Sequence, residues 1–145
     1  MRKLLIIGLL LLILALVFFR AKPEEKKYIS INGKKIEVDI ADTVALRQQG
    51  LSERKNLCPD CGMLFLFSEP GPHSFWMRKM YFDIDIIWIK GEKIVDITKN
   101  VPKPAPEEFE WPKTTYTNKE PADKVIEVNS GWCDANGIEI GDFVY

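Results

Sequence analysis

Short runs of apolar residues, separated by turn-forming and charged residues, fill the chain after residue 28. The strongest runs cover residues 63–67, 75–78 and 84–90, and they are rich in aromatic and β-branched side chains. Runs of about four to eight such residues bounded by Pro, Gly or charged groups are typical of strands in a packed sheet. The pattern therefore predicts a core that is dominated by a sheet.

The weaker signals extend this prediction on both sides of the central runs. Asn32 and Gly33 supply the two positive-φ positions of a type I′ turn, so residues 28–31 and 34–40 are expected to form a hairpin. Asp42 can cap a short helix that ends at Gly50. Further strands are expected at residues 93–98, 124–128 and 142–145, and a short helix or turn at residues 131–137.

Residues 101–121 are expected to be a long loop, because prolines recur through them and exclude regular ladders. Loops of this length are usually functional lids or insertions, and both readings remain open here. The whole pattern predicts a mostly β domain, α+β by strict count. We expect a small barrel-like antiparallel or mixed sheet with one or two short helices.

The first 22 residues differ from the rest of the chain. Residues 4–19 are all apolar or small, and as a helix they would span about 24 Å. This is slightly less than a bilayer core of about 30 Å, and the flanking Arg and Lys side chains can reach the headgroups. Because residues 17–21 lack the small residues of a cleavage site, an uncleaved membrane anchor is favoured over a signal peptide.

This division gives an anchor at residues 1–22, a tether at 23–27 and one domain at 28–145. Basic residues flank the apolar segment on both sides, so they do not settle its orientation. A short positive segment ahead of an apolar core is typical of exported proteins, which favours an extracytoplasmic domain.

The charge balance bears on the partners of this domain. The chain has 20 basic and 21 acidic residues, and four of the basic ones lie in the first 22 positions, which leaves 16 against 21. Binding to nucleic acid needs a clustered basic face, and no such stripe is visible. The expected partners are therefore the membrane, through residues 4–19, and an envelope protein or small ligand, without nucleic acid.

Several spaced blocks resemble one known family. They are Gly50-Leu51, Arg54, Gly62-Met63-Leu64-Phe65, Phe75-Trp76-Met77, Asp85-Ile86-Ile87, Glu127, Gly131-Trp132, Gly137 and Gly141-Asp142. In this order they resemble the domain of unknown function 192 family over residues 28–145. The resemblance implies a small, mostly β, barrel-like domain that often follows an N-terminal signal or anchor, and it implies no established activity.

The chain departs from the family pattern in two places. Arg78, Lys79 and Met80 replace a Lys-Asn-Thr block, so a site built on that Asn/Thr pair is in doubt. Cys58 and Cys61 stand where polar residues are expected in relatives, which suggests a local addition.

The two cysteines at this spacing allow three readings. In an oxidising compartment Cys58 and Cys61 would pair as a disulfide, with Cys133 left free. A redox-active dithiol would need a helix start after the first cysteine, and a β-type run follows instead. As half of a zinc site, they would need His73 and Cys133, which are 60 residues apart in the sequence. No cofactor is expected otherwise.

Other polar residues could form a ligand site or an acid/base site. Asp83 and Asp85 share a strand face and could form an acid/base pair, and Asp85 could also act with Glu127. The alternative is that Asp85 is a buried hydrogen-bond hub. The ligand-binding candidates are Asp85, Arg78, Glu127 and Trp111. Trp76 and Met77 are expected to lie at least partly in the core.

No phosphate-binding loop and no Ser-His-Asp set occurs, and a single histidine excludes most His-dependent mechanisms. The leading hypothesis is a membrane-anchored extracytoplasmic module that binds a partner or small ligand. The alternatives are an envelope enzyme that uses Asp85, Glu127 and Arg78 in a cleft, or a module stabilised by zinc.

Overall fold

The computed structural model describes residues 27–145, so the expected anchor and nearly all of the tether lie outside it. Among the described residues no helix is long and apolar enough to cross a membrane. The elements are, in chain order, β1 (Lys27–Ile31), β2 (Lys34–Ala41), α2 (Val44–Gln49), β3 (Cys61–Gly71), β4 (Ser74–Trp76), β5 (Ile84–Lys90), β6 (Lys93–Val101), the 3-10 helix η1 (Pro106–Glu108), β7 (Thr115–Thr117), β8 (Ala122–Asn129) and α3 (Trp132–Ala135).

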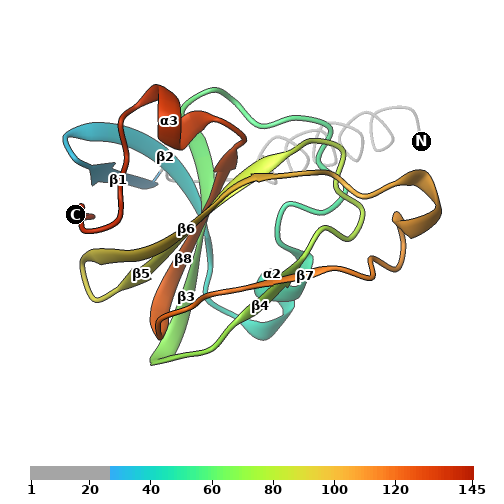
Figure 1. The fold of residues 1–145 in the computed structure, drawn as a ribbon, viewed down its shortest axis with the longest axis horizontal. Helices are drawn as coiled ribbons and strands as arrows, with labels where there is room; N and C mark the ends of the chain where they lie inside the picture. Colours follow the sequence, from blue (N-terminus) through green and yellow to red (C-terminus); the bar gives the residue numbers. More distant parts are fainter. Residues whose placement is uncertain (1–26) are drawn as a thin grey trace, which may run out of the picture.

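Six of these strands form one mixed sheet in the order β1-β2-β3-β8-β5-β6 (Figure 1). The β2–β3 pair is parallel and the other pairs are antiparallel. The prediction of a mostly β fold with short helices is confirmed. The barrel-like closure is wrong, because β1 and β6 are the two edges of an open sheet.

The last residues of the chain contact both edges of this sheet. They do not form the terminal strand predicted at residues 142–145, and isolated bridges join Val144 to Ile31 and Phe143 to Lys93. Backbone bonds between Ser30 and Tyr145 hold the C-terminus against β1. The end of the chain thus ties the two edges together on one side without completing a barrel.

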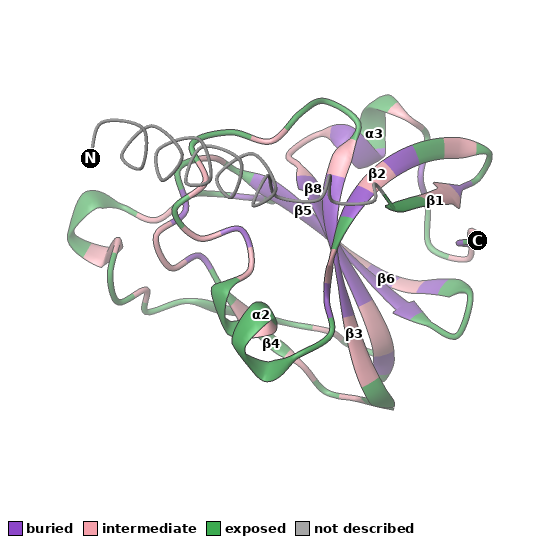
Figure 2. Cartoon of the chain, turned by 180° about the vertical axis from the view of Figure 1, so that it is seen from behind, coloured by how far each residue is buried: buried purple, intermediate pink, exposed green. Residues whose placement is uncertain are grey.

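The sheet is buried on both faces, as the purple central strands in Figure 2 show. One face packs under α3 and the C-terminal segment, with Trp132 and Cys133 in its core cluster. The other face packs under the segments around α2 and β4, with Leu51 and Met80 in its cluster. Burial on both faces explains why β5 is almost continuously apolar in sequence.

Local sequence accounts for most of the element boundaries. Asn32 and Gly33 have φ values of 50° and 81°, which confirms the predicted hairpin turn. The predicted short helix is present, but it is capped by the Thr43 side chain rather than by Asp42. Gly62 is required by packing, since a Cβ there would lie 2.8 Å from the Glu127 carbonyl oxygen on the neighbouring strand.

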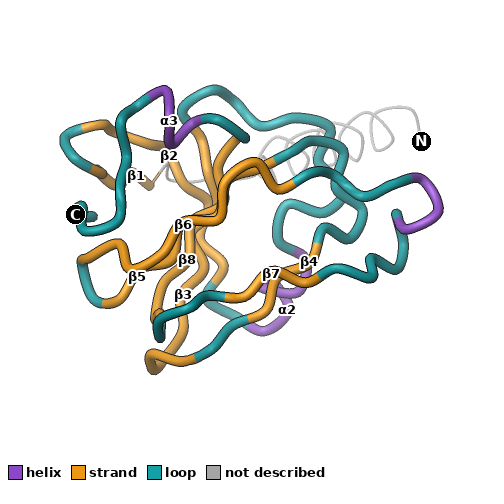
Figure 3. The backbone as a smooth tube through the Cα atoms, in the orientation of Figure 1, coloured by secondary structure: helices purple, strands orange, loops and turns teal. Residues whose placement is uncertain are grey.

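The segment 101–121 departs from the prediction of a loop without ladders. Its residues Thr115–Thr117 form β7, which pairs with β4 in a separate two-stranded sheet. Figure 3 shows this pair beside α2, away from the edges of the main sheet. Together α2, β4 and β7 build the structure around the candidate site.

Candidate functional site

An open recess of about 490 Å³ lies between α2, the end of β3 and the β4–β7 pair. Its apolar walls are Val44, Phe67, Phe75 and Trp76, and its polar groups are Arg47, Gln48, His73, Ser74 and Thr115. Small-ligand sites usually have volumes of about 300 to 1,000 Å³ and mostly apolar walls with a few polar groups. The recess has the size and composition of such a site.

The aromatic walls of the recess are held by the core behind them. Phe75 contacts Phe65 edge-on at 4.9 Å and Trp88 at 5.4 Å between ring centroids. Phe67 stacks on His73 at 3.5 Å, and His73 Nε2 lies 2.8 Å from the carbonyl oxygen of Ala122. That carbonyl can only accept, so Nε2 carries the proton. The wall is therefore fixed before any ligand arrives.

Trp76 forms the exposed part of this wall. Its side chain is 45% exposed, whereas the neighbouring Met77 is 3% exposed and belongs to the core. The expectation that both lie at least partly in the core is confirmed for Met77, whereas Trp76 belongs to neither core cluster. The strand β4 is only three residues long, and it turns Trp76 toward the recess.

Arg47 supplies the positive charge of the recess. Its Nη1 donates to the carbonyl oxygens of Asp42 at 2.7 Å and Leu66 at 2.9 Å. The guanidinium carbon lies 5.2 Å from the centroid of the Phe67 ring. These contacts hold the guanidinium against the aromatic wall, and they use only the two N–H groups of Nη1.

A smaller cavity adjoins the recess behind Phe75 and Trp76. Its volume is about 20 Å³, and Glu127 of β8 lines it together with Ser52 and Met80. A cavity needs only about 10 to 15 Å³ to hold one water molecule. Burial raises the pKa of Glu127 to about 8, and the charge of Arg54 lowers it in part. The carboxyl is therefore mostly protonated at neutral pH.

Asp85 and Glu127 face opposite sides of the sheet. Asp85 lies opposite Val128, and Glu127 lies opposite Ile86, so alternation along the strands separates the two carboxyls. Asp85 accepts hydrogen bonds from the backbone N–H groups of Asn100 at 2.8 Å and Cys133 at 3.1 Å. Its contacts are those of a buried hydrogen-bond hub, and the structure does not place it with Glu127 in a cleft.

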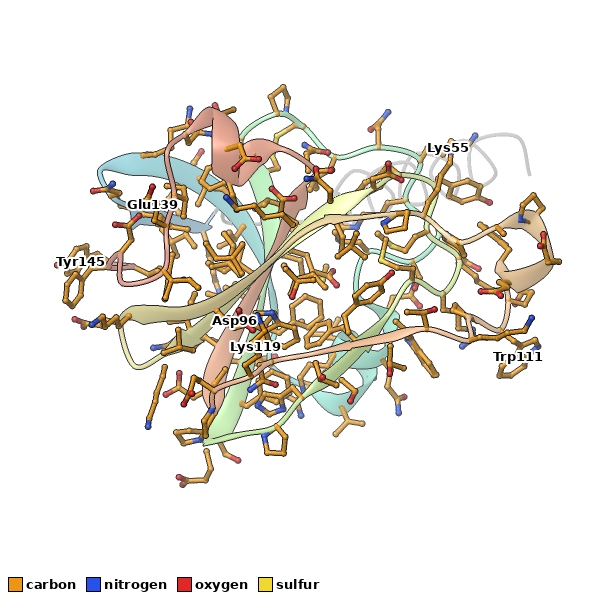
Figure 4. The ribbon with its side chains drawn as sticks, viewed as in Figure 1. Lys55, Asp96, Trp111, Lys119, Glu139 and Tyr145 are labelled. Atoms are coloured by element: carbon orange, nitrogen blue, oxygen red, sulfur yellow. A yellow bond between two sulfur atoms is a disulfide. The ribbon has the colours of Figure 1, made fainter. Side chains whose placement is uncertain are left out.

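Arg78 and Trp111 meet at a different place, near the 3-10 helix. Arg78 lies 5.2 Å above the Trp111 ring, and its Nη2 is 3.9 Å from the Glu110 carboxylate. Trp111 is 73% exposed and projects from the outer loop, as labelled in Figure 4. Neither residue lines the recess. The four candidate ligand-binding residues therefore lie at three separate places.

The predicted pairing of Cys58 with Cys61 is confirmed, because the structure joins them in a disulfide with Cα atoms 5.1 Å apart. Cys133 is free and buried, and burial raises the pKa of its thiol. Within residues 27–145 no three His, Cys, Asp or Glu side chains form a group that could hold a metal ion. The structure does not bring His73 and Cys133 to the cysteine pair.

Sequence reasoning missed the residues that build the recess. Arg47 and Gln48 occur in an ordinary polar helix, and His73 was considered only as a metal ligand. The relevant signal is spatial, since pairing of β4 with β7 brings residues 74–76 to segment 115–117. No sequence pattern encodes that pairing.

Comparison with known proteins places this fold in a family. The family model DUF192, described as "Uncharacterized ACR", matches residues 27–145. No curated protein matches the chain in sequence.

Two solved structures are similar to this chain over most of its length. One is a Sinorhizobium meliloti 1021 protein described as a "putative transcription regulator", with 29% identity and a TM-score of 0.73. The alignment covers 83% of this chain and 92% of that one. The other is a Novosphingobium aromaticivorans DSM 12444 protein of unknown function, with 26% identity, a TM-score of 0.73, and coverage of 86% and 89%.

Proposed function

This chain belongs to the DUF192 family, and from that premise we propose that it is a membrane-tethered extracytoplasmic domain that binds a small ligand. The ligand occupies the recess between α2 and the β4–β7 pair. The observation that carries the proposal is the recess itself, with three aromatic side chains and a guanidinium around about 490 Å³. A fixed, mostly apolar concavity with few polar groups is the usual form of a small-ligand site.

The positions of the candidate catalytic side chains favour a binding role over catalysis. The enzyme hypothesis needs Asp85, Glu127 and Arg78 in one cleft, and they lie at three separate places. None of the described residues that line the recess is a carboxylate that could act beside His73. These arrangements suit recognition of a ligand better than proton transfer to one.

The extracytoplasmic location is supported by the apolar residues 4–19 and by the Cys58–Cys61 disulfide. Disulfides persist in oxidising compartments and are rare in the cytosol. The acidic balance beyond residue 22 favours a small ligand over a nucleic acid, although the S. meliloti relative is described as a "putative transcription regulator".

The binding site can be tested by fluorine NMR of the full-length protein in detergent micelles, with fluorinated tryptophan at its four positions. We expect neutral compounds with one aromatic ring, such as phenylacetamide, to shift the Trp76 resonance in a saturable way. Trp76 lines the recess, whereas Trp111 is 73% exposed elsewhere and reports on the micelle and solvent. The Trp111 resonance is expected to stay in place.

Each resonance can be assigned by replacing one tryptophan with phenylalanine. Equal shifts of Trp76 and Trp111 would indicate partitioning into the micelle. If none of a panel of small aromatic compounds shifts Trp76 alone, the recess is not a ligand site and the proposal is wrong.

The location can be tested by labelling intact cells with a membrane-impermeant maleimide before and after reduction. We expect Cys58 and Cys61 to be labelled only after reduction, because they are paired in a compartment that the reagent reaches. Cys133 is expected to need denaturant as well, since it is fully buried. Mass spectrometry identifies the modified cysteines.

A single introduced cysteine shows where the domain lies independently of whether Cys58 and Cys61 are oxidised. Ser68 is exposed on β3, so a Ser68→Cys variant that also carries Cys58→Ser and Cys61→Ser offers one accessible thiol. It is expected to react in intact cells without reduction. Reaction of this introduced cysteine only after lysis would place the domain in the cytoplasm and contradict the proposed location.

A further inference from the structure

Arg47 differs from the other arginines of the domain in its partners. Among residues 27–145, Arg54 pairs with Asp39 at 2.6 Å and Arg78 pairs with Glu110 at 3.9 Å. Arg47 bonds only to the backbone carbonyls of Asp42 and Leu66, and no described carboxylate pairs with it. Its charge is therefore not neutralised within the described part of the chain.

The position of this charge makes it a recognition group for an anion. Arg47 is half-buried, lines the recess and is held over the Phe67 ring, so its orientation is set in advance. Nη2 and Nε keep three N–H donors that form no hydrogen bond to a described residue. A guanidinium fork with parallel N–H groups matches the two oxygens of a carboxylate.

The rest of the recess indicates what the anion is attached to. Its walls include Phe67, Phe75 and Trp76, which offer flat apolar surfaces for a ring. Among residues 27–145 no carboxylate side chain lines it, so none of the described lining residues carries a charge that repels an anion. The nearby Glu127 faces the inner cavity and is mostly protonated at neutral pH, so it adds little negative charge.

We propose that the recess binds a small aromatic carboxylic acid, with the ring against Phe75 and Trp76 and the carboxylate on the free N–H groups of Arg47. This inference rests on the proposed function and names the chemical class of its ligand. A carboxylate on Arg47 gains charge-assisted hydrogen bonds that an amide or an amine of the same shape does not gain.

The test compares phenylacetate, phenylacetamide and phenethylamine by their dissociation constants from the Trp76 fluorine resonance of the full-length protein. We expect phenylacetate to bind about tenfold more tightly than phenylacetamide, with phenethylamine weakest, since the charge-assisted bond is partly exposed to water. Raising NaCl from about 0.05 M to about 0.5 M is expected to weaken only the acid, about threefold.

Two variants assign the preference to Arg47. In Arg47→Gln the acid and the amide are expected to bind equally, and retained binding of the amide shows that the recess is intact. Val44→Glu adds a carboxylate one helical turn before Arg47, at a position that is 63% exposed, and it is expected to neutralise the guanidinium. Val44 also forms part of the apolar wall, so Val44→Gln, with the same size and no charge, is expected to weaken the acid and the amide alike and to retain only their ratio of about tenfold.

The outcomes separate this inference from the proposed function. If all three compounds bind equally to the wild type, the recess is a ligand site and the inference about acids is wrong. If phenethylamine binds best, the site selects cations and the inference is equally overturned. If no compound shifts Trp76, the inference fails together with the proposed function.

Discussion

Replacing Glu127 by Gln is expected to remove most of the loss of stability that the wild-type domain shows between about pH 4.5 and pH 8. Burial raises the pKa of the Glu127 carboxyl from 4.5 to about 8 in the folded state. Across this range the unfolded chain releases a proton that the folded domain retains. The free energy of unfolding of the wild type therefore decreases as the pH rises.

The size of the effect follows from the width of this range. Each unit of pKa difference corresponds to about 1.4 kcal/mol, so the wild type is expected to lose on the order of 4 to 5 kcal/mol relative to Glu127→Gln by pH 8. Below about pH 4.5 both states are protonated and the two proteins should have similar stability. Urea unfolding of both proteins at several pH values measures the difference directly.

Glu120→Gln is the matched control, because it removes the same charge from an exposed position. Glu120 is exposed and does not contact Glu127, so this variant should show the same change of unfolding free energy with pH as the wild type. A constant difference between Glu127→Gln and the wild type from pH 4.5 to 8 would show that the Glu127 carboxyl is already ionised in the folded domain.

The strands were predictable wherever one stretch of sequence contained all the information. Residues 84–90 form β5 at the predicted bounds, because an apolar run interrupted only by Asp85 lies between Asp83 and Lys90 and is buried on both faces. The turn at Asn32 and Gly33 was equally local, since the two residues supply its backbone conformation themselves. Helix α2 was predicted from similar local signals, and α3 lies where a short helix or turn was expected, whereas η1 lies in a segment that was expected to be a loop.

The predictions that failed depend on pairing between distant segments. Whether the sheet closes is decided at its edges β1 and β6, and no local pattern records which strands become neighbours. The exposure of Trp76 depends on the pairing of β4 with β7, so the sequence did not show that nearly half of this side chain is exposed.

The candidate site was less predictable than the fold for the same reason. The sequence singled out Asp85 and Glu127. Whether their side chains point to the same face of the sheet depends on the register between β5 and β8. Arg47 has no distinctive neighbours in sequence. It stands out only in space, where the other two described arginines have carboxylate partners and it has backbone carbonyls.

Trp88→Ala is expected to lower the free energy of unfolding by about 3 to 5 kcal/mol, as large-to-small changes in a core do. Trp88 is fully buried in β5, an interior strand of the sheet, and its Nε1 donates to Thr98 Oγ1 at 3.0 Å. The substitution removes the whole ring and leaves the Thr98 hydroxyl without this partner. Urea unfolding followed by circular dichroism measures the loss.

The matched control, Trp111→Ala, removes the same side chain from a position that is 73% exposed, and it should change stability by less than about 0.5 kcal/mol. Trp88 also supports the recess, because its ring contacts Phe75 edge-on at 5.4 Å. The Trp88→Ala variant should therefore bind phenylacetamide more weakly even at a pH and temperature at which it remains folded. A loss of less than about 1 kcal/mol would mean that the core collapses around the missing ring, and unchanged binding would mean that Phe75 keeps its place without Trp88.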